Sequence, residues 1–483
     1  MLDAALLIRN ESVAASDAST FDRTNPITGS VATRAAAASV EDARHAGNVA
    51  AAAFPEWSGL GPNARREVLN RAADTLLSRT AEFADAVTAE TGGTRKWGEY
   101  NCRLGASILR EAAAMTTQMT GEVIPADKAG SFAMAVRQPC GVVLALAPWN
   151  APVVLGVRSV AMPLACGNTA ILKASELCPR THNMIGEVFR DAGLPAGALN
   201  VVNSAPDDAA DVVEALIGHP AVRRVNFTGS TRVGRVIAEV CARHIKRCLL
   251  ELSGKAPLIV LDDADLDEAV KAAAFGAFFH QGQICMSTER IIVHDRIADA
   301  FLERLRDRAS DIRAGDPSDP ACALGSMISD QAAERVKSLI DDAVRKGAQL
   351  VAGGGRQGVF VDPTILAGVI PSMRIYYEES FGPVASVIRV MDDEEAVSVA
   401  NDTEYGLVAA VFSRDVARAL KVAQRIETGI CHINAPTIHD EAQMPFGGVK
   451  ASGYGRFGSR AGVDEFTELR WITIQNEPQT YPI

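Results

Sequence analysis

A cysteine and a glutamate near the middle of the chain have the residue types of covalent catalysis. Cys285 stands among small and flexible residues in segment 278–290, and Glu251 lies upstream of it in an apolar stretch. A thiolate is a strong nucleophile, and a carboxylate in apolar surroundings gains strength as a base. A lone cysteine is more often a packing residue, so its neighbours must decide. We interpret the pair as a covalent nucleophile and its general base.

A third polar residue follows an apolar run. Asn150 ends the tripeptide Pro148, Trp149, Asn150, directly after residues 142–147. An asparagine amide can donate a hydrogen bond to an oxygen that gains negative charge during a reaction. Trp149 alone would be typical of a core residue. Asn150 is therefore a candidate for stabilising an oxyanion.

Segment 227–234 has the composition of an anion-binding turn. A predicted strand ends there, and Gly229, Ser230, Val233 and Gly234 open a predicted helix. Glycine lets the backbone approach a ligand, and the N–H groups and dipole of a helix start favour a phosphate. The spacing is not G-x-G-x-x-G. The plainer alternative is a Gly-Ser turn with Ser230 or Thr231 as the helix N-cap.

Lys173, Ser175 and Glu176 also follow a predicted strand. Ligands of open α/β sheets bind at the carboxyl ends of strands, where these side chains suit ribose hydroxyls. A carboxylate facing the ribose 2′-hydroxyl would repel a 2′-phosphate, which favours NAD over NADP. The alternative is a surface ion pair.

Glu379 and Phe381 stand two residues apart, so in an extended segment they point to the same face. That arrangement would hold a second ribose and a nicotinamide ring. The alternative is a turn closed by Gly382 and Pro383 around a core phenylalanine.

Composition excludes several classes of function. The chain has 483 residues, of which 48% are hydrophobic and 22% charged, and a net charge of −11, which argues against binding nucleic acid through bulk charge. Its longest apolar runs are too short to span a bilayer, and residues 4–8 do not read as a signal peptide. Nine cysteines without a C-x-x-C pair predict free thiols in a reducing cytosol and no metal site.

The order of predicted elements indicates an α/β protein. Residues 32–53 and 67–90 predict helices. From Val142 onward, short strands rich in valine and isoleucine alternate with helices, as in parallel sheets covered by helices. Two such series follow one another, with predicted helices at 94–115, 180–192, 207–217, 265–279, 297–312, 330–346 and 416–427. Residues 131–138 and 465–475 predict strands outside both sheets, of the kind that pairs between subunits.

Together these motifs resemble the aldehyde dehydrogenase superfamily, from about Phe21 to the C-terminus. The matching segments are 148–150, 173–176, 227–234, 251–255, 281–285, 379–383 and 445–450. Within the family, segments 247–252, 283–290, 373–376 and 464–469 are similar to the salicylaldehyde and vanillin dehydrogenases. Those are bacterial enzymes that oxidise aromatic aldehydes during the degradation of aromatic compounds.

The resemblance implies a fold of two Rossmann-type parallel-sheet domains and a β oligomerisation arm. Residues 1–118, 139–249 and 440–461 would bind NAD. Residues 250–436 would carry the catalytic cysteine. Residues 119–138 and 462–483 would form the arm of a cytoplasmic homodimer or dimer of dimers.

The implied reaction is oxidation of an aromatic aldehyde of the salicylaldehyde, vanillin or benzaldehyde type to its carboxylic acid. Cys285 would form a thiohemiacetal and then a thioester, with the oxyanion held by the Asn150 amide and the Cys285 backbone N–H. Glu251 would activate the hydrolytic water. The implied NAD contacts are Pro148, Trp149, Lys173, Ser175, Glu176, Gly229, Ser230, Val233, Gly234, Leu252, Glu379 and Phe381.

An aromatic pocket is implied around the helix after Asn150. Aromatic and methionine side chains can sandwich an aryl ring, and an arginine can meet a phenolic oxygen. The arginine has a second interpretation, an intrahelical salt bridge or subunit contact, and Trp97 and Tyr100 suit the core equally. The candidates are Trp97, Tyr100, Ala151, Arg158, Ile284, Met286 and Phe446.

Three departures from the family pattern qualify these expectations. Ser253 replaces a glycine after Glu251 and Leu252, and Arg460 stands where some relatives have a second carboxylate. A glycine-rich turn of many relatives is Asn203, Ser204, Ala205 here, which leaves adenine contacts open. Arg158 keeps a semialdehyde substrate open, whereas Glu251 argues against acyl transfer to CoA. A non-catalytic binding or structural protein is the alternative from another class.

Overall fold

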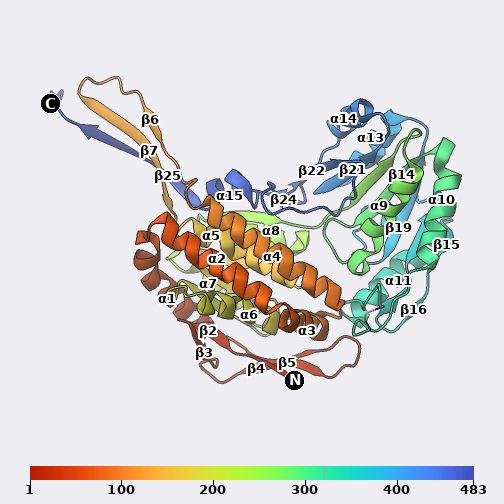
Figure 1. The fold of residues 1–483 in the computed structure, drawn as a ribbon, viewed down its shortest axis with the longest axis horizontal. Helices are drawn as coiled ribbons and strands as arrows, with labels where there is room; N and C mark the ends of the chain where they lie inside the picture. Colours follow the sequence, from red (N-terminus) through yellow and green to blue (C-terminus); the bar gives the residue numbers. More distant parts are fainter. Residues whose placement is uncertain (320) are drawn as a thin grey trace.

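The computed structural model describes residues 1–319 and 321–483. Two twisted sheets with helices on their faces lie side by side, and a three-stranded arm projects from the first of them (Figure 1). The two sheets matter for function because their facing ends hold the side chains described below.

The first sheet has eight strands, of which the central five are parallel. Successive residues of β8 face opposite sides, so Val143 and Ala145 pack with helices α2 to α6, whereas Val142 and Leu144 pack with α1, α7 and α8. In spatial order the strands are β24 (Gly453–Tyr454), β12 (Arg247–Glu251), β11 (Val222–Thr228), β8 (Val142–Leu146), β9 (Thr169–Lys173), β10 (Leu199–Val202), β2 (Leu6–Ile8) and β3 (Glu11–Val13).

Helices cover both faces of this sheet (Figure 1). They are α1 (Val40–Gly59), α2 (Pro62–Ser78), α3 (Thr80–Thr91), α4 (Arg95–Met115), α5 (Pro152–Ala165), α6 (Pro179–Asp191), α7 (Ala209–Gly218) and α8 (Thr231–Arg243).

The second sheet repeats this plan. One face packs against α9 and α10 through Leu258 and Val293, and the other against α13 and α14 through Ile259 and Ile292. Its strands, in spatial order, are β15 (Gln349–Ala352), β18 (Thr364–Ala367), β19 (Val384–Val390), β14 (Thr288–His294), β13 (Ala256–Val260), β21 (Val408–Phe412) and β22 (Ile430–Ile433).

Seven helical segments lie between the strands of the second sheet along the chain or directly before one of them. They are α9 (Leu266–Phe278), the 3₁₀ turn η1 (Phe279–Gly282), α10 (Asp295–Ser310), α11 (Asp330–Arg345), α12 (Arg374–Tyr377), α13 (Asp393–Asn401) and α14 (Val416–Ala423).

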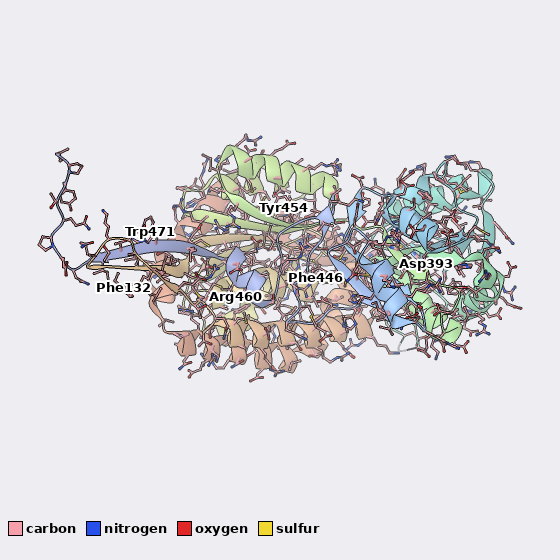
Figure 2. All side chains as sticks on the ribbon, turned by 90° about the horizontal axis from the view of Figure 1, so that it is seen from above. Phe132, Asp393, Phe446, Tyr454, Arg460 and Trp471 are labelled. Carbon is pink, nitrogen blue, oxygen red and sulfur yellow. The ribbon has the colours of Figure 1, made fainter. Side chains whose placement is uncertain are left out.

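The arm consists of β6 (Glu122–Ile124), β7 (Ser131–Pro139) and β25 (Thr467–Gln475), which pair antiparallel with β7 in the middle. Phe132 and Trp471 lie on this arm, which projects from the body of the chain (Figure 2). The two outlying strands expected from the sequence therefore pair with each other within one chain.

The remaining short elements lie at the edges of these parts. They are β1 (Leu2–Ala4), β4 (Thr20–Thr24), β5 (Val31–Ala36), β16 (Arg356–Gln357), β17 (Phe360–Val361), β20 (Tyr405–Gly406), β23 (Val449–Lys450) and α15 (Ser459–Glu465). Among the described residues, none of the helices is long and apolar enough to cross a membrane.

The prediction of one helix over residues 32–53 is wrong. The chain continues as β5 to Ala36, pairs there with β1 and β4, and enters α1 only after Ser39, whose side chain caps the helix with that of Asp42. Alanine's helix propensity is a weak preference, and strand pairing overrides it.

Two other predicted helices need correction, and two strands escaped prediction. Residues 67–90 form two helices, because the backbone of Arg79 leaves helical geometry between α2 and α3. The helix predicted over 416–427 ends at Ala423. Strands β18 and β21 were not predicted, since short, fully buried strands lack the polar alternation of half-exposed ones.

Candidate active site

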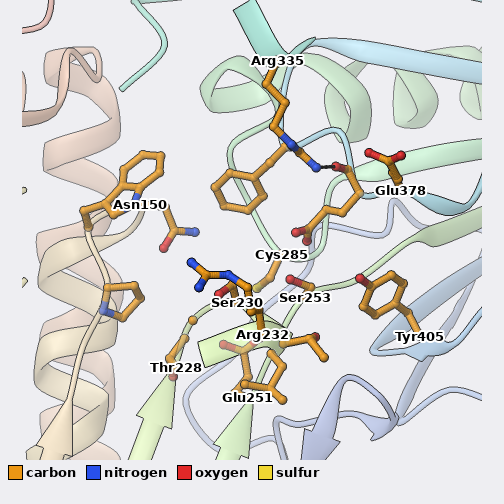
Figure 3. Close-up of a pocket in the computed structure, with 17 residues that line it drawn as sticks. Asn150, Thr228, Ser230, Arg232, Glu251, Ser253, Cys285, Arg335, Glu378 and Tyr405 are labelled. Carbon is orange, nitrogen blue, oxygen red and sulfur yellow. Dashed lines mark hydrogen bonds between the residues drawn. The ribbon is translucent and has the colours of Figure 1, made fainter. Parts of the chain in front are cut away.

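A cavity of about 490 Å³ lies at the carboxyl ends of β8, β11 and β12, against loops of the second sheet (Figure 3). Asn150, Glu251 and Cys285 all border it, although they come from three separate parts of the sequence. The full lining is Pro148, Trp149, Asn150, Thr228, Gly229, Ser230, Thr231, Arg232, Glu251, Leu252, Ser253, Cys285, Arg335, Glu378, Glu379, Phe381 and Tyr405.

The loop that carries Cys285 is fixed by its own backbone and by Gln283. His280 and Gln281 have positive φ angles of 48° and 56°, which turn the chain sharply after α9. The Gln283 carbonyl oxygen accepts a hydrogen bond from the Asn150 amide at 3.1 Å, and its side-chain oxygen accepts one from the Ile328 N–H at 2.9 Å. These contacts hold Cys285 at the cavity wall, where it remains partly exposed.

Gly254 allows the Glu251 loop to approach Cys285. A Cβ atom at position 254 would lie 2.6 Å from the Cys285 carbonyl oxygen, a distance that real side chains do not tolerate. The preceding Ser253 causes no comparable conflict, because its side chain lies at the cavity and its carbonyl accepts a hydrogen bond from the Ser452 hydroxyl at 2.6 Å. The change from glycine to Ser253 thus leaves Glu251 at the end of β12.

Glu251 is 1% exposed, and neither of its carboxylate oxygens has a hydrogen-bond partner among the described residues. Burial raises its pKa to about 7; the Cys285 thiol and the Arg158 guanidinium oppose that rise, and the charges of Glu379 and Asp440 add to it. A carboxyl group with this pKa changes protonation near neutral pH, as a general base must.

The thiol of Cys285 responds to the same surroundings. Burial raises its pKa well above the usual value, and the negative charge of Glu251 raises it further. The thiolate is therefore the less favoured form of Cys285 while Glu251 is ionised.

Two hydrogen bonds orient Asn150. Its side-chain nitrogen donates to the Gln283 carbonyl, and its own carbonyl accepts a hydrogen bond from the Trp97 indole N–H at 2.9 Å. An amide NH₂ group has two N–H donors, so one remains for a ligand in the cavity. Trp97 is itself 3% exposed and stacks on His280, with ring centroids 4.3 Å apart. Trp97 therefore positions Asn150 from the core.

The start of α8 forms one wall of the cavity. Ser230 caps this 13-residue helix by accepting a hydrogen bond from the Val233 N–H, and Gly229 donates from its N–H to the Glu251 carbonyl at 3.0 Å. The N–H groups of Thr231 and Arg232 lie in the first turn, where a helix favours an anion. The N-cap alternative for segment 227–234 is confirmed at Ser230, and the anion site at the same helix start stays a prediction.

Two aromatic rings close another part of the cavity. Trp149 and Phe381 meet edge to face, with ring centroids 5.8 Å apart. Glu379 lies beside Phe381 and accepts a hydrogen bond from the Gly254 N–H at 2.9 Å, and burial raises its pKa to about 7. Arg335 donates to the Glu379 carbonyl at 2.7 Å, which ties α11 to this wall.

A buried ion pair supports the same wall from behind. Lys255 lies 2.5 Å from Glu289, whose carboxylate accepts hydrogen bonds from the backbone N–H groups of Ser380 and Phe381. The loop after Glu251 and the loop of Glu379 are thereby joined into one structure.

Lys173, Ser175 and Glu176 lie at the end of β9, next to β8, and do not line the cavity itself. The Lys173 ammonium is 3.4 Å from the Glu176 carboxylate, and burial lowers its pKa. Lys173 is buried, whereas the side chain of Glu176 is 34% exposed, so only the lysine end of this ion pair is internal.

The substrate-pocket candidates do not line this cavity, and most of them belong to the apolar core on one face of the first sheet. Trp97, Ala151, Ile284, Met286 and Phe446 belong to one apolar cluster, against which Tyr100 and Cys285 pack. The guanidinium of Arg158 lies 4.5 Å above the Phe446 ring centroid and pairs with Asp440. That ion pair joins α5 to a distant loop, so the intrahelical salt bridge weighed for Arg158 is wrong.

Several site residues were not predicted. Thr228, Thr231 and Arg232 lie inside a recognised motif, whereas Arg335 and Tyr405 come from segments without any local signal. Arg460 is exposed on α15 and does not line the cavity (Figure 2).

The chain is similar to known proteins over its full length. The sequence pattern of the aldehyde dehydrogenase family matches residues 13–472. A vanillin dehydrogenase of Pseudomonas fluorescens is 60% identical over 483 residues, 100% of both chains, and a salicylaldehyde dehydrogenase of Pseudomonas sp. strain C18 is 49% identical over 99% of both. The crystal structure of a salicylaldehyde dehydrogenase from Pseudomonas putida G7 complexed with salicylaldehyde superposes with a TM-score of 0.98, at 48% identity and full coverage of both chains.

Proposed function

The chain belongs to the aldehyde dehydrogenase family, and we propose that it oxidises aromatic aldehydes to carboxylic acids with NAD. One observation carries the proposal: Cys285, Glu251 and Asn150 converge on a single cavity that also contains a helix start suited to phosphate. Vanillin and salicylaldehyde dehydrogenases as full-length relatives support the aromatic substrate.

Cys285 begins the reaction as a thiolate, its proton leaving to solvent through the cavity. Its sulfur bonds to the aldehyde carbon, and the carbonyl electron pair moves to oxygen, which gives a thiohemiacetal anion. The free N–H of the Asn150 amide and the backbone N–H of Cys285 hold that oxygen. Release of hydride from this carbon leaves a thioester on Cys285.

The residues of the cavity fit a nicotinamide dinucleotide. The N–H groups at the start of α8, with Gly229, Ser230, Val233 and Gly234, would hold its phosphates. Pro148, Trp149, Leu252, Glu379 and Phe381 would hold its nicotinamide half. When bound, the nicotinamide supplies the acceptor for the hydride.

Glu251 completes the reaction as general base. Its carboxylate, ionised above about pH 7, takes a proton from water as the water oxygen attacks the thioester carbon. The carbon–sulfur bond breaks, the carboxylic acid leaves, and Cys285 returns as thiolate.

The choice of NAD over NADP follows from Glu176. Its carboxylate lies beside Lys173 at the end of β9, where an adenosine ribose would meet it. A 2′-phosphate there would face a like charge in partly buried surroundings. Lys173 and Ser175 are then left for the ribose hydroxyls.

The aromatic ring of the substrate occupies the apolar cluster beside Cys285. Trp97 and Tyr100 stack on one another at 5.5 Å, and Arg158 covers Phe446. Planar side chains of this kind fit an aryl group better than a flexible alkyl chain. The proposed contacts are Trp97, Tyr100, Ala151, Arg158, Ile284, Met286 and Phe446.

The test is reduction of NAD, and in parallel NADP, with salicylaldehyde, vanillin, succinic semialdehyde and hexanal. We expect the two aromatic aldehydes to have the highest kcat/KM, with NAD as the better cofactor. Preference for either aliphatic substrate would keep the mechanism and overturn the aromatic pocket. No reduction with any of the four would overturn the function.

Replacing Asn150 with alanine tests the oxyanion site. We expect kcat to fall by about 10²–10³-fold, the usual loss for one such donor, with little change in cofactor affinity. Asn200→Ala removes a fully buried asparagine, on β10 outside the cavity, and serves as the control for a lost core amide. An Asn150→Ala enzyme within threefold of the wild-type kcat would remove this residue from the mechanism.

We further propose that residues 119–138 and 462–483 form an oligomerisation arm beside an NAD-binding part (1–118, 139–249 and 440–461) and a catalytic part (250–436). Leu469 and Trp471 are 62% and 77% exposed on one face of β25, too much apolar surface for an isolated strand. Trp471→Glu should lower the molar mass measured by light scattering, whereas Arg470→Gln on the opposite face should not. An unchanged mass for Trp471→Glu would contradict the assignment.

A further inference from the structure

Arg158 and Asp440 form a buried ion pair beside the catalytic residues. The Nη2 atom of Arg158 donates to both carboxylate oxygens of Asp440, at 2.9 and 2.6 Å, and each side chain is 6% exposed. Burying a charge costs free energy, and removing one partner of a buried ion pair leaves the other charge uncompensated. The positive charge of Arg158 is therefore neutralised by Asp440.

The surroundings of the pair are those of the proposed aldehyde pocket. Arg158 lies over Phe446, and both members act on Glu251: Arg158 lowers its pKa and Asp440 raises it. Asp440 also contributes to the raised pKa of Tyr100, for which burial is the largest cause. The pair thus lies within electrostatic reach of both the base and the aromatic wall.

We propose that Asp440 is a specificity-determining residue, which neutralises Arg158 so that the pocket admits neutral ring substituents and excludes aldehydes that carry a carboxylate. This inference rests on the function proposed above. It explains how an arginine, the side chain that most readily binds carboxylates, can serve an aromatic rather than a semialdehyde site.

Charge decides which of the two substrate classes the pocket accepts. An unpaired arginine binds a carboxylate through two parallel hydrogen bonds, but here Nη2 already donates to both oxygens of Asp440, whose charge neutralises the guanidinium. A second carboxylate would enter a buried space next to the negative charges of Asp440 and Glu251, where Arg158 is already paired. A phenol hydroxyl can instead donate to Asp440 and adds no net charge.

The experiment compares acids with their neutral methyl esters. Wild-type enzyme is assayed with 2-, 3- and 4-formylbenzoate and with the methyl ester of each. We expect kcat/KM for the preferred ester to exceed that for the matching acid by about 100-fold or more. In Asp440→Asn this ester-to-acid ratio should fall by at least about tenfold, because Arg158 becomes available to the acid.

The ratio is taken within each variant, so changes in the reactivity of Cys285 or Glu251 cancel. The double variant Arg158→Met, Asp440→Leu removes both charges and should keep the high ratio, because no cation is released. Asp464→Asn breaks another Arg–Asp pair, with Arg137 in the arm, and should leave the ratio unchanged.

Two results would overturn the inference while the function stands: wild-type enzyme that oxidises acids and esters equally, or a folded Asp440→Asn enzyme with the wild-type ratio. The first needs no variant, so the inference can fail even where Asp440→Asn does not fold. Wild-type enzyme that oxidises none of the esters, vanillin or salicylaldehyde would overturn the proposed function itself.

Discussion

Replacing Cys285 with alanine is expected to lower kcat by at least about 10⁴-fold, the largest effect of any single substitution in this chain. Without the sulfur no bond to the aldehyde carbon forms, and hydride would have to leave a hydrated aldehyde instead of a thiohemiacetal. The fold should persist, because Cys285 is partly exposed at a cavity and alanine creates no strain there. The measurement is steady-state NAD reduction, together with NAD affinity by calorimetry.

The matched control is Cys248→Ala. Cys248 is also partly exposed, but it lies on β12 outside the cavity, where its thiol contacts the Tyr454 hydroxyl at 3.0 Å. This variant should keep wild-type turnover. A Cys285→Ala enzyme that binds NAD and turns over within tenfold of wild type would refute covalent catalysis.

Replacing Glu251 with glutamine has the second largest expected effect, a fall in steady-state kcat of about 10³-fold. The amide cannot take a proton from water, so the thioester on Cys285 should accumulate. Thioester formation itself should survive, since the charge of Glu251 raises the pKa of Cys285 and its removal lowers that pKa. Rapid mixing should therefore show a burst of about one NADH per active site, followed by slow turnover.

The pH dependence gives an independent measure of the same residue. Glu251 has a pKa raised to about 7, so its basic form prevails above pH 7 and wild-type kcat should fall as the pH drops below that value. The limb near pH 7 should be absent in Glu251→Gln. Because burial also raises the pKa of Glu379 to about 7, Glu379→Gln is the control, and it should keep the limb. If the limb disappears in Glu379→Gln but persists in Glu251→Gln, it reports the ionisation of Glu379 and not that of Glu251.

The catalytic residues could be proposed from the sequence because each lies in a short local motif. Glu251 ends a buried strand, Asn150 follows another, and Cys285 stands in a turn of small residues. Their convergence depends on topology, since the carboxyl ends of β8 and β12 meet at one edge of a parallel sheet. Alternating strands and helices in the sequence predict a parallel sheet, and therefore an edge at which the carboxyl ends of its strands meet.

What the sequence could not give depends on contacts between distant segments. Asp440 lies 282 residues from Arg158 in a loop without a motif, and Arg335 reaches the cavity from the side of α11. The switch from β5 to α1 inside an alanine-rich run was missed because alanine accepts both conformations, and pairing with β1 and β4 decides. The role of Trp97 in holding Asn150 likewise follows only from the structure, which shows that the indole N–H donates to the Asn150 carbonyl.

The most direct test is mass spectrometry of Glu251→Gln after brief mixing with NAD and salicylaldehyde or vanillin. We expect one added aromatic acyl group per chain, found on the peptide that contains Cys285 and removed by hydroxylamine. A burst of NADH without an adduct, or an adduct on another of the nine cysteines, would contradict this expectation.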